Sequence, residues 1–345
     1  MKRLRIAVVG IGHIGTQHAR HAHDVGDLIA VCDIKKDRAD TIATQYHAHP
    51  YYTITDLLTN EPDLDLVSIC TPNGLHAQHT IQALKAGANV LCEKPMATTV
   101  TDCEHMIHTA EQTNRRLFIV KQNRFNPPVQ ALKQAITEGR LGKPINIQVN
   151  CFWNRNQQYY KDSDWRGTLD LDGGTLFTQY SHFIDLLYWM IGDVESVNVY
   201  THNYLHRDTI QFEDTGVAIL TFTNGAIGTI NFTINSYGKN MEGSLTIFGE
   251  KGTVKIGGQY LNILEYQNIQ DYTIPTPPPG NPPNTYGTNT LGSMSNHDKV
   301  YQNIVDVLIH GGKVATDMLD GLKTVQIIEK IYKAAGRKPQ ETSTP

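Results

Sequence analysis

The stretch "RIAVVGIGHIG" at Arg5–Gly15 decides the fold. A short β-branched run ends at Gly10, and a helix-like segment opens at Ile14. The turn between them matches GxGxxG: Gly10 permits the tight turn, Gly12 the close approach of a pyrophosphate, and Gly15 close packing of helix on sheet. The helix N-terminus supplies N–H groups and a positive dipole. This context predicts a dinucleotide-binding strand–turn–helix.

The residues around this turn indicate which dinucleotide is bound. His13 and Ile14 belong to the same turn and are expected to contact the cofactor. Asp33 ends the next strand, where a carboxylate would accept hydrogen bonds from the adenosine ribose. A carboxylate repels a 2′-phosphate, so NAD(H) is favoured over NADP(H). Lys35 and Lys36 follow closely and soften that preference.

The first third of the chain alternates apolar strands with helix-compatible segments. Further strands are predicted at 28–33, 66–72, 89–95 and 116–120, and helices at 36–45, 75–86 and 100–114. Near-continuous apolar strands separated by helices indicate a parallel sheet covered on both faces. The sequence therefore predicts an α/β protein whose residues 1–122 form a Rossmann NAD-binding domain.

The pattern changes after about Gly142 to β-rich runs separated by turn residues. Residues 123–345 are predicted to form an α+β domain for substrate binding and oligomerisation, with a large open, mostly antiparallel sheet. One long helix is expected at 176–191, and the helices at about 298–335 are expected to pack back toward the Rossmann domain. The segment 272–296 contains "PTPPPGNPPN" and is predicted to hold no regular element.

Composition excludes several classes of protein. The 345 residues are 40% hydrophobic and 19% charged, enough to bury a substantial core, and the net charge of −4 argues against nucleic-acid binding. No apolar run reaches the roughly 18–20 residues that cross a bilayer, and the start has no signal-peptide pattern. Five scattered cysteines without a CxxC pair indicate the reducing cytoplasm, and fifteen histidines without an HExxH pattern predict no metal site.

Polar groups follow three of the predicted parallel strands, where ligands bind in open sheets. These groups are Thr71, Pro72, Asn73 and His76 in the first, Glu93 and Lys94 in the second, and Asn123 and Arg124 in the third. Lys94 would stabilise a developing alkoxide, and a nearby NAD⁺ charge would lower its pKa toward that of a general base. The alternative is a solvated strand-end lysine. Glu93 would orient Lys94 or the ribose, and His76 either caps a helix or contacts the cofactor.

The second part of the chain offers a histidine and an aromatic, basic loop. Thr178, His182 and Asp185 would share one helix face, with His182 accepting the substrate hydroxyl proton or binding that hydroxyl. In "CFWNRNQQYYKDSDWRG" (151–167), aromatic rings alternate with basic groups. The residues expected to bind substrate there are Trp153, Tyr159, Trp165 and Arg166. They suit an anionic ligand that carries rings, whereas the alternative is a surface loop at a subunit contact.

Taken together, "GIGHIG", "TPN", "EKP" and the "GG…H..D" segment resemble the glucose–fructose oxidoreductase / inositol dehydrogenase (Gfo/Idh/MocA) family over nearly the whole chain. The resemblance implies a Rossmann domain, an open-sheet domain, bound NAD(H) or NADP(H), and homodimers or homotetramers. It implies that Glu93-Lys94-Pro95 carries the catalytic lysine, commonly with a cis Lys–Pro bond. Many members have aspartate where this chain has Thr178, which weakens an inference to simple sugar or inositol dehydrogenases.

Longer segments, including "VKQNRFNPP" and "KNMEGSLTIFGEKGTVKIGG", resemble the WlbA-type UDP-sugar 3-dehydrogenase branch. That resemblance implies NAD-dependent oxidation of the 3-hydroxyl of UDP-2-acetamido-2-deoxy-D-glucuronate in bacterial surface-polysaccharide biosynthesis, with Lys239 as a further substrate contact. UDP-N-acetylglucosamine 3-dehydrogenase is a close alternative. A free-sugar or inositol dehydrogenase, an NAD-dependent glycosidase and a non-enzymatic NAD(H)-binding regulator are the others.

Overall fold

The computed structural model of the chain describes residues 3–286 and 290–337, which divide into two compact units. The first unit comprises the chain up to Val120 and residues 297–325, and the second comprises 121–296 and the described residues from 326. Residues 297–325, which the sequence prediction assigned to the second domain, therefore belong to the first unit. Helix α11 (Met318–Ala334) contributes its first half to one unit and its second half to the other.

The first unit is built on a six-stranded parallel sheet of order β3-β2-β1-β4-β5-β6. Its strands are β1 (Arg5–Val9), β2 (Asp27–Cys32), β3 (His49–Tyr51), β4 (Leu66–Ile69), β5 (Asn89–Cys92) and β6 (Leu117–Ile119). β4 and β6 are buried along their whole lengths, as expected for a sheet covered on both faces. The sequence prediction missed β3, whose three residues are too few to show a periodicity.

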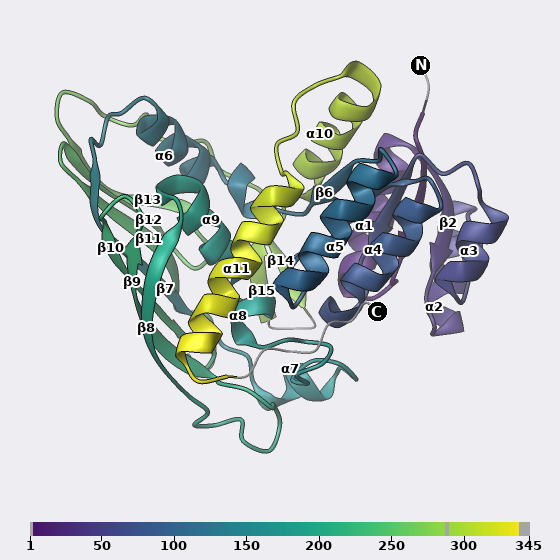
Figure 1. Ribbon diagram of the computed structural model, residues 1–345, viewed down its shortest axis with the longest axis horizontal. Helices are drawn as coiled ribbons and strands as arrows, with labels where there is room; N and C mark the ends of the chain where they lie inside the picture. The colour runs from purple at the N-terminus through teal and green to yellow at the C-terminus, as the bar shows by residue number, and fades with distance from the viewer. Residues whose placement is uncertain (1–2, 287–289, 338–345) are drawn as a thin grey trace. The chain divides into compact units, whose positions relative to one another are not determined.

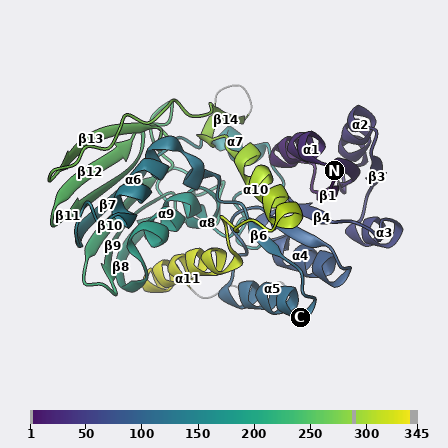
Figure 2. The same ribbon diagram turned by 90° about the horizontal axis from the view of Figure 1, so that it is seen from above.

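Helices cover both faces of this sheet (Figure 2). They are α1 (His13–Val25), α2 (Lys36–Tyr46), α3 (Ile54–Asn60), α4 (His76–Lys85), α5 (Val100–Gln112) and α10 (His297–His310), with a 3₁₀ turn η1 (Asn73–Leu75) before α4. Helix α10 packs against α1 although almost 300 residues separate their starts in the sequence. The late segment of the chain thus completes the first unit.

The second unit is built on a seven-stranded sheet of order β13-β12-β11-β7-β10-β9-β8 (Figure 1). Its strands are β7 (Pro144–Phe152), β8 (Val194–His202), β9 (Thr215–Phe222), β10 (Ile227–Thr233), β11 (Glu242–Gly249), β12 (Gly252–Gly257) and β13 (Ile263–Ile269). Every neighbouring pair is antiparallel except β10 with β7. The predicted fold class, a Rossmann unit followed by an α+β unit with a mostly antiparallel sheet, is confirmed.

Short helices and one hairpin complete the second unit. They are η2 (Gln122–Phe125), α6 (Pro127–Thr137), α7 (Gln157–Lys161), α8 (Thr175–Thr178), α9 (Ser181–Ile191), and the hairpin strands β14 (Pro283–Tyr286) and β15 (Thr290–Met294). The prediction that 272–296 holds no regular element was wrong, because β14, which begins at Pro283 within the proline cluster, pairs with β15. Among the described residues, no helix is long and apolar enough to cross a bilayer.

The helix predicted at 176–191 is confirmed except for one interruption, because α8 ends at Thr178 and α9 begins at Ser181. Gln179 is buried at this break, and its side chain accepts from Arg155 Nε (2.8 Å) and donates to the Tyr159 hydroxyl (2.9 Å). Thr178 therefore lies on a different helix from His182 and Asp185, and the three residues do not share one helix face as predicted.

A buried ion pair ties η2 to α9. Both side-chain oxygens of Asp185 accept from the guanidinium of Arg124, at 2.8 and 2.7 Å, and Lys121 Nζ lies 3.0 Å from Oδ1. Burial alone would raise the pKa of Asp185, but the two cations outweigh it and lower the pKa to about 2. The buried charges of Arg124 and Lys121 are therefore balanced by one carboxylate, that of Asp185.

Replacing Asp185 by asparagine is expected to lower the free energy of unfolding by about 3 kcal/mol, because two buried cations lose their counter-charge. Since the folded pKa of about 2 lies below the usual 3.8, the carboxylate stabilises the fold above pH 3.8, and this contribution is lost as the pH falls through about 2. Urea unfolding from neutral to acid pH should show the loss and a flatter acid limb. Asp208→Asn, on an exposed carboxylate, is the control; equal stability of the two variants would contradict the assignment.

Candidate active site

The glycine turn between β1 and α1 has the geometry of a phosphate-binding loop. Gly10 has φ +91°, and a Cβ there would lie 2.7 Å from the carbonyl of Cys70. A Cβ on Gly15 would lie 1.8 Å from the carbonyl oxygen of Gly10. A Cβ on Gly12, by contrast, would meet nothing within 4 Å. Two glycines are therefore required by the fold, whereas Gly12 leaves open space in front of α1, as an approaching pyrophosphate requires.

Asp33 organises this turn from the end of β2. Its carboxylate accepts from the backbone N–H of Ile11 at 2.7 Å and from that of Lys35 at 2.8 Å. Each carboxylate oxygen accepts one of these bonds and retains a second lone pair for a ribose hydroxyl. Asp33 thus combines the predicted position at the strand end with a structural role that the sequence did not reveal.

The segment after β4 is held by two histidines of α4. His76 is 1% exposed, and its Nε2 lies 2.9 Å from the carbonyl oxygen of Thr71. His79 Nδ1 lies 3.1 Å from the Thr71 hydroxyl. Pro72 precedes the 3₁₀ turn, and Asn73 is buried in it. The predicted cofactor residues of this segment are therefore brought beside the glycine turn, whose Gly10 packs on Cys70.

Glu93 is the centre of a buried hydrogen-bond network within the first unit. Its Oε1 lies 2.9 Å from His18 Nε2 and 3.2 Å from His297 Nε2, and its Oε2 accepts from the backbone N–H of Lys94 at 3.0 Å. Burial alone would raise the pKa of Glu93, but the hydrogen bonds from His18 and His297 outweigh it and hold the pKa well below its usual value. The carboxylate of Glu93 is therefore engaged internally and orients the backbone of Lys94.

The network continues away from Glu93 through α10. His18 Nδ1 lies 3.0 Å from the Tyr301 hydroxyl, which lies 2.8 Å from Ser68 Oγ. His18, His297 and Tyr301 were missed by the sequence prediction because they carry no local motif and meet only in the folded chain. One carboxylate oxygen and two imidazole nitrogens within 4.8 Å could hold a metal ion. Here, however, both rings already donate to Glu93.

The catalytic lysine proposed from sequence follows β5 directly. The peptide bond between Lys94 and Pro95 is cis, as the family resemblance implied. Glu93 holds the N–H of Lys94, and the carbonyl oxygen of Pro95 lies 2.7 Å from His76 Nδ1. The turn that carries Lys94 is thus held on both sides by buried groups.

In the second unit, His182 is the second residue of the helix α9 and is 6% exposed. Its Nε2 lies 3.3 Å from the amide nitrogen of Gln122, which also donates to Ser293 Oγ at 3.1 Å. The neighbouring Asn123 is 2% exposed, and neither polar atom of its side chain has a hydrogen-bond partner among the described residues. Gln122 Oε1 and Ser181 Oγ are also buried without a hydrogen-bond partner among the described residues.

Unpaired buried polar atoms are unusual because each costs about 1–3 kcal/mol. Ser181 precedes His182, Gln122 is bonded to it and Asn123 follows Gln122, so these atoms could be satisfied by a ligand with several hydroxyl or amide groups. Asn123 was predicted as a substrate contact, whereas Gln122 and Ser293 were missed. The polar run "KQN" after β6 was the only sequence signal for Gln122.

Thr178 contacts a carboxylate from elsewhere in the second unit. Its hydroxyl donates to Asp172 Oδ1, and the backbone N–H of Gly167 donates to Asp172 Oδ2 at 2.8 Å. Burial raises the pKa of Asp172 to about 6 despite these bonds. The sequence prediction missed Asp172 because it precedes the glycine pair and lies outside the family pattern.

Two residues predicted to bind substrate lie in the protein interior. Trp153 is 2% exposed and donates from Nε1 to the carbonyl of Gln259 at 3.0 Å. Arg124 is committed to Asp185, and its guanidinium lies over the Trp189 ring at 4.9 Å. The polar groups of both residues already have partners within the fold.

The remaining predicted residues form a half-buried cluster and one exposed cation. The Arg166 guanidinium lies over the Tyr159 ring at 4.2 Å and beside the Trp165 ring at 5.8 Å. Its Nη1 donates to the carbonyl of Tyr159 at 3.2 Å. Lys239 is exposed in the loop before β11. A stacked arginine with accessible rings can bind an anion and a planar ring together.

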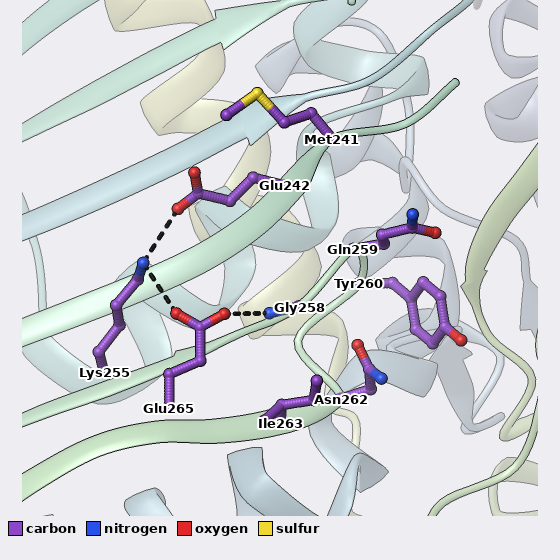
Figure 3. A pocket seen from close by; sticks show the side chains of 9 residues that line it. All are labelled: Met241, Glu242, Lys255, Gly258, Gln259, Tyr260, Asn262, Ile263 and Glu265. Carbon is purple, nitrogen blue, oxygen red and sulfur yellow. Dashed lines mark hydrogen bonds and ion pairs between the residues drawn. The ribbon is translucent and has the colours of Figure 1, made fainter. Parts of the chain in front are cut away.

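A shallow depression of about 360 Å³ lies over β11, β12 and β13 (Figure 3). Lys255 Nζ lies there between Glu242 (3.3 Å) and Glu265 (2.8 Å), and Glu265 also accepts from the N–H of Gly258 at 2.7 Å. Its one cation is thus paired with both of its carboxylates. The depression is lined by none of the residues predicted for the active site.

A Rossmann unit with an open glycine turn and a strand-end lysine defines an NAD-binding oxidoreductase. Residues 4–121 match the oxidoreductase family with an NAD-binding Rossmann fold, and residues 129–255 match the Gfo/Idh/MocA C-terminal domain. The chain belongs to the Gfo/Idh/MocA oxidoreductase family. The predicted family, enzyme class and NAD cofactor are confirmed.

Two solved structures and one curated relative show which members of the family this chain resembles. The WlbA dehydrogenase from Bordetella pertussis, solved with NADH and UDP-GlcNAcA, is 34% identical over 99% of this chain and 100% of that chain, with a TM-score of 0.87. The WlbA dehydrogenase from Chromobacterium violaceum, with the same ligands, is 35% identical over 98% of this chain and 95% of that chain, with a TM-score of 0.88. Myo-inositol 2-dehydrogenase from Thermotoga maritima is 27% identical over 73% of this chain and 74% of its own length.

Gly12→Ala and Gly15→Ala form a matched pair that separates cofactor binding from folding. Gly12→Ala should fold with nearly unchanged stability but bind NAD⁺ about 10-fold more weakly or worse, because the added methyl group occupies the open space in front of α1. Gly15→Ala should unfold at lower denaturant, because its Cβ collides with the Gly10 carbonyl. Urea unfolding and NAD⁺ titration measure the two effects. Unchanged NAD⁺ affinity in Gly12→Ala would place the pyrophosphate elsewhere.

Proposed function

We propose that this enzyme oxidises the 3-hydroxyl of a UDP-N-acetylamino sugar with NAD⁺, the lead substrate being UDP-2-acetamido-2-deoxy-D-glucuronate. The main support is the whole-chain similarity to two dehydrogenases that were solved with UDP-GlcNAcA, at 34% and 35% identity. The inositol dehydrogenase matches a smaller share of the chain at lower identity. The product would enter bacterial surface-polysaccharide biosynthesis.

The polar groups of the second unit suit such a substrate. The unpaired buried atoms of Asn123, Gln122 and Ser181 would be satisfied by sugar hydroxyls and the N-acetyl group. The rings of Tyr159 and Trp165 would stack on uracil, while Arg166 and Lys239 would pair with the diphosphate. A free sugar would leave this aromatic, basic cluster without a role.

In the proposed mechanism, Lys94 and His182 both contact the 3-hydroxyl. One of them takes the hydroxyl proton, and the cation that remains or forms stabilises the developing alkoxide. NAD⁺, when bound, accepts the hydride from C3. Glu93 holds Lys94 through its backbone N–H, and Gln122 holds the ring of His182 through Nε2. Orientation of the hydroxyl by these pre-held groups supplies much of the acceleration.

Three assignments complete the proposal. The glycine turn with His13 and Ile14 binds the pyrophosphate, and Asp33 binds the adenosine ribose. The enzyme is a homodimer or homotetramer. UDP-N-acetylglucosamine is the second candidate substrate. A C6 carboxylate would need a basic side chain to pair with it. Among the described residues that were predicted to bind substrate, no buried arginine has an uncommitted guanidinium for this purpose.

A small substrate panel tests the function directly. NADH absorbance is followed with NAD⁺ and, in turn, UDP-2-acetamido-2-deoxy-D-glucuronate, UDP-N-acetylglucosamine, N-acetylglucosamine and myo-inositol. A signal restricted to the glucuronate supports the lead substrate, and a signal with UDP-N-acetylglucosamine shifts the substrate but keeps the mechanism. No signal with either UDP-sugar, with and without a 2-oxo acid to recycle bound NADH, would overturn the proposal.

Lys94→Met is expected to lower kcat by about 10²–10⁴-fold, because the group that stabilises the alkoxide or accepts the proton is lost. NAD⁺ affinity should stay within a few fold of the wild type, since the glycine turn and Asp33 are intact. Stopped-flow NADH formation and NAD⁺ titration measure both quantities. Lys85→Met, on an exposed lysine of α4, is the control; a Lys94→Met enzyme with the wild-type kcat would remove Lys94 from the chemistry.

A further inference from the structure

His76 links the ends of two neighbouring strands in the first unit. It is the first residue of α4 and is 1% exposed. Its Nε2 lies 2.9 Å from the carbonyl oxygen of Thr71, after β4, and its Nδ1 lies 2.7 Å from the carbonyl oxygen of Pro95, after β5. One ring therefore spans the segment expected to contact the cofactor and the turn that carries Lys94.

The chemistry of the two partners limits what His76 can do. Carbonyl oxygens only accept hydrogen bonds, and each ring nitrogen faces one of them. No ring nitrogen is therefore left to bind a cofactor, so the geometry does not support the sequence expectation that His76 is a cofactor contact. Both nitrogens face carbonyl groups of the protein, which fits a role of His76 in holding the segments after β4 and β5.

A neutral ring carries one N–H and satisfies only one of these carbonyls. Burial lowers the pKa of His76, and the charge of Lys94 acts in the same direction, while the bonds to Pro95 and Thr71 and the charge of Glu93 oppose it. Burial also lowers the pKa of His79, on the same helix, to about 4. His79 therefore adds little positive charge at neutral pH. Because the contact to Pro95 is the shorter of the two, we assign the single proton of the neutral ring to Nδ1.

The turn around Lys94 is consequently held at two points. The Glu93 carboxylate accepts the N–H of Lys94, and His76 donates to the carbonyl of the next residue, Pro95. Accepting the proposed role of Lys94, we propose that His76 is a positioning residue that fixes the catalytic lysine through the Pro95 carbonyl. The bond to Thr71 is secondary for turnover.

Two isosteric substitutions separate the bonds. Asparagine places its amide nitrogen where Nδ1 lies, so His76→Asn can donate to the Pro95 carbonyl but not to that of Thr71. Glutamine places its amide nitrogen near Nε2, so His76→Gln can donate to the Thr71 carbonyl but not to that of Pro95. His108→Asn and His108→Gln, on an exposed histidine of α5, are the matched controls.

Turnover and cofactor affinity are measured for all four variants with the best substrate of the panel. We expect kcat of His76→Gln to fall by about 10²-fold, the cost of a displacement near 1 Å at a catalytic group. His76→Asn should lose less than about 10-fold, and NAD⁺ affinity should change little in both. Equal losses of kcat in the two variants, or a loss confined to NAD⁺ affinity, would overturn the assignment.

A substrate-independent measurement separates this inference from the proposed function. Reductive ¹³C-methylation gives Lys94 an NMR resonance, identified by its absence in Lys94→Met, whose pH titration reports the surroundings of the amine. His76→Gln should shift this titration, whereas His76→Asn and the His108 variants should leave it near the wild-type value. If no sugar is turned over yet His76→Gln alone shifts the titration, the function fails and the positioning role stands. If sugar is oxidised but the titration is unchanged in every variant, the proposed function stands and the positioning role fails.

Discussion

The buried carboxylate of Glu93 is the interaction on which the first unit depends most. It accepts from two histidines that come from opposite ends of the chain, His18 in α1 and His297 in α10, and from the backbone of Lys94. A buried carboxylate is costly unless it is fully hydrogen-bonded. The same bonds that remove this cost dock α10 onto the Rossmann unit and fix the backbone of the lysine turn, so stability and site geometry share one set of contacts.

In the cofactor turn, too, the same residues contribute to the fold and to the binding site. Gly10 and Gly15 are glycines because any Cβ would collide with backbone, whereas Gly12 is bordered by open space. Asp33 holds the turn through the N–H of Ile11 and still has acceptor capacity for a ribose. Some residues of the ligand-binding motif are thus required mainly for the backbone conformation of the turn.

In the second unit, a buried carboxyl group lies beside Thr178. Thr178 cannot hold a proton-carrying carboxylate, but it contacts Asp172, whose pKa is raised by burial to about 6. Near His182, several buried polar atoms lack partners, which a polyhydroxylated ligand would provide. Arg124 and Trp153, both chosen from sequence as substrate contacts, have partners within the fold, and a side chain's type alone does not reveal such partners.

The sequence by itself determined the parallel sheet, the glycine turn, Asp33 and the placement of Lys94 directly after β5, because these features are encoded by local periodicity and short motifs. Only the tertiary structure decided that His297 and Tyr301 join Glu93, that His76 reaches Pro95, that Asp172 backs Thr178, and that the chain breaks at Gln179 instead of continuing one helix. Each of these depends on contacts between residues distant in sequence or on a buried side chain whose partner lies in another segment. Local pattern carries no information about such partners, since the free energy that selects them arises only when the chain is folded.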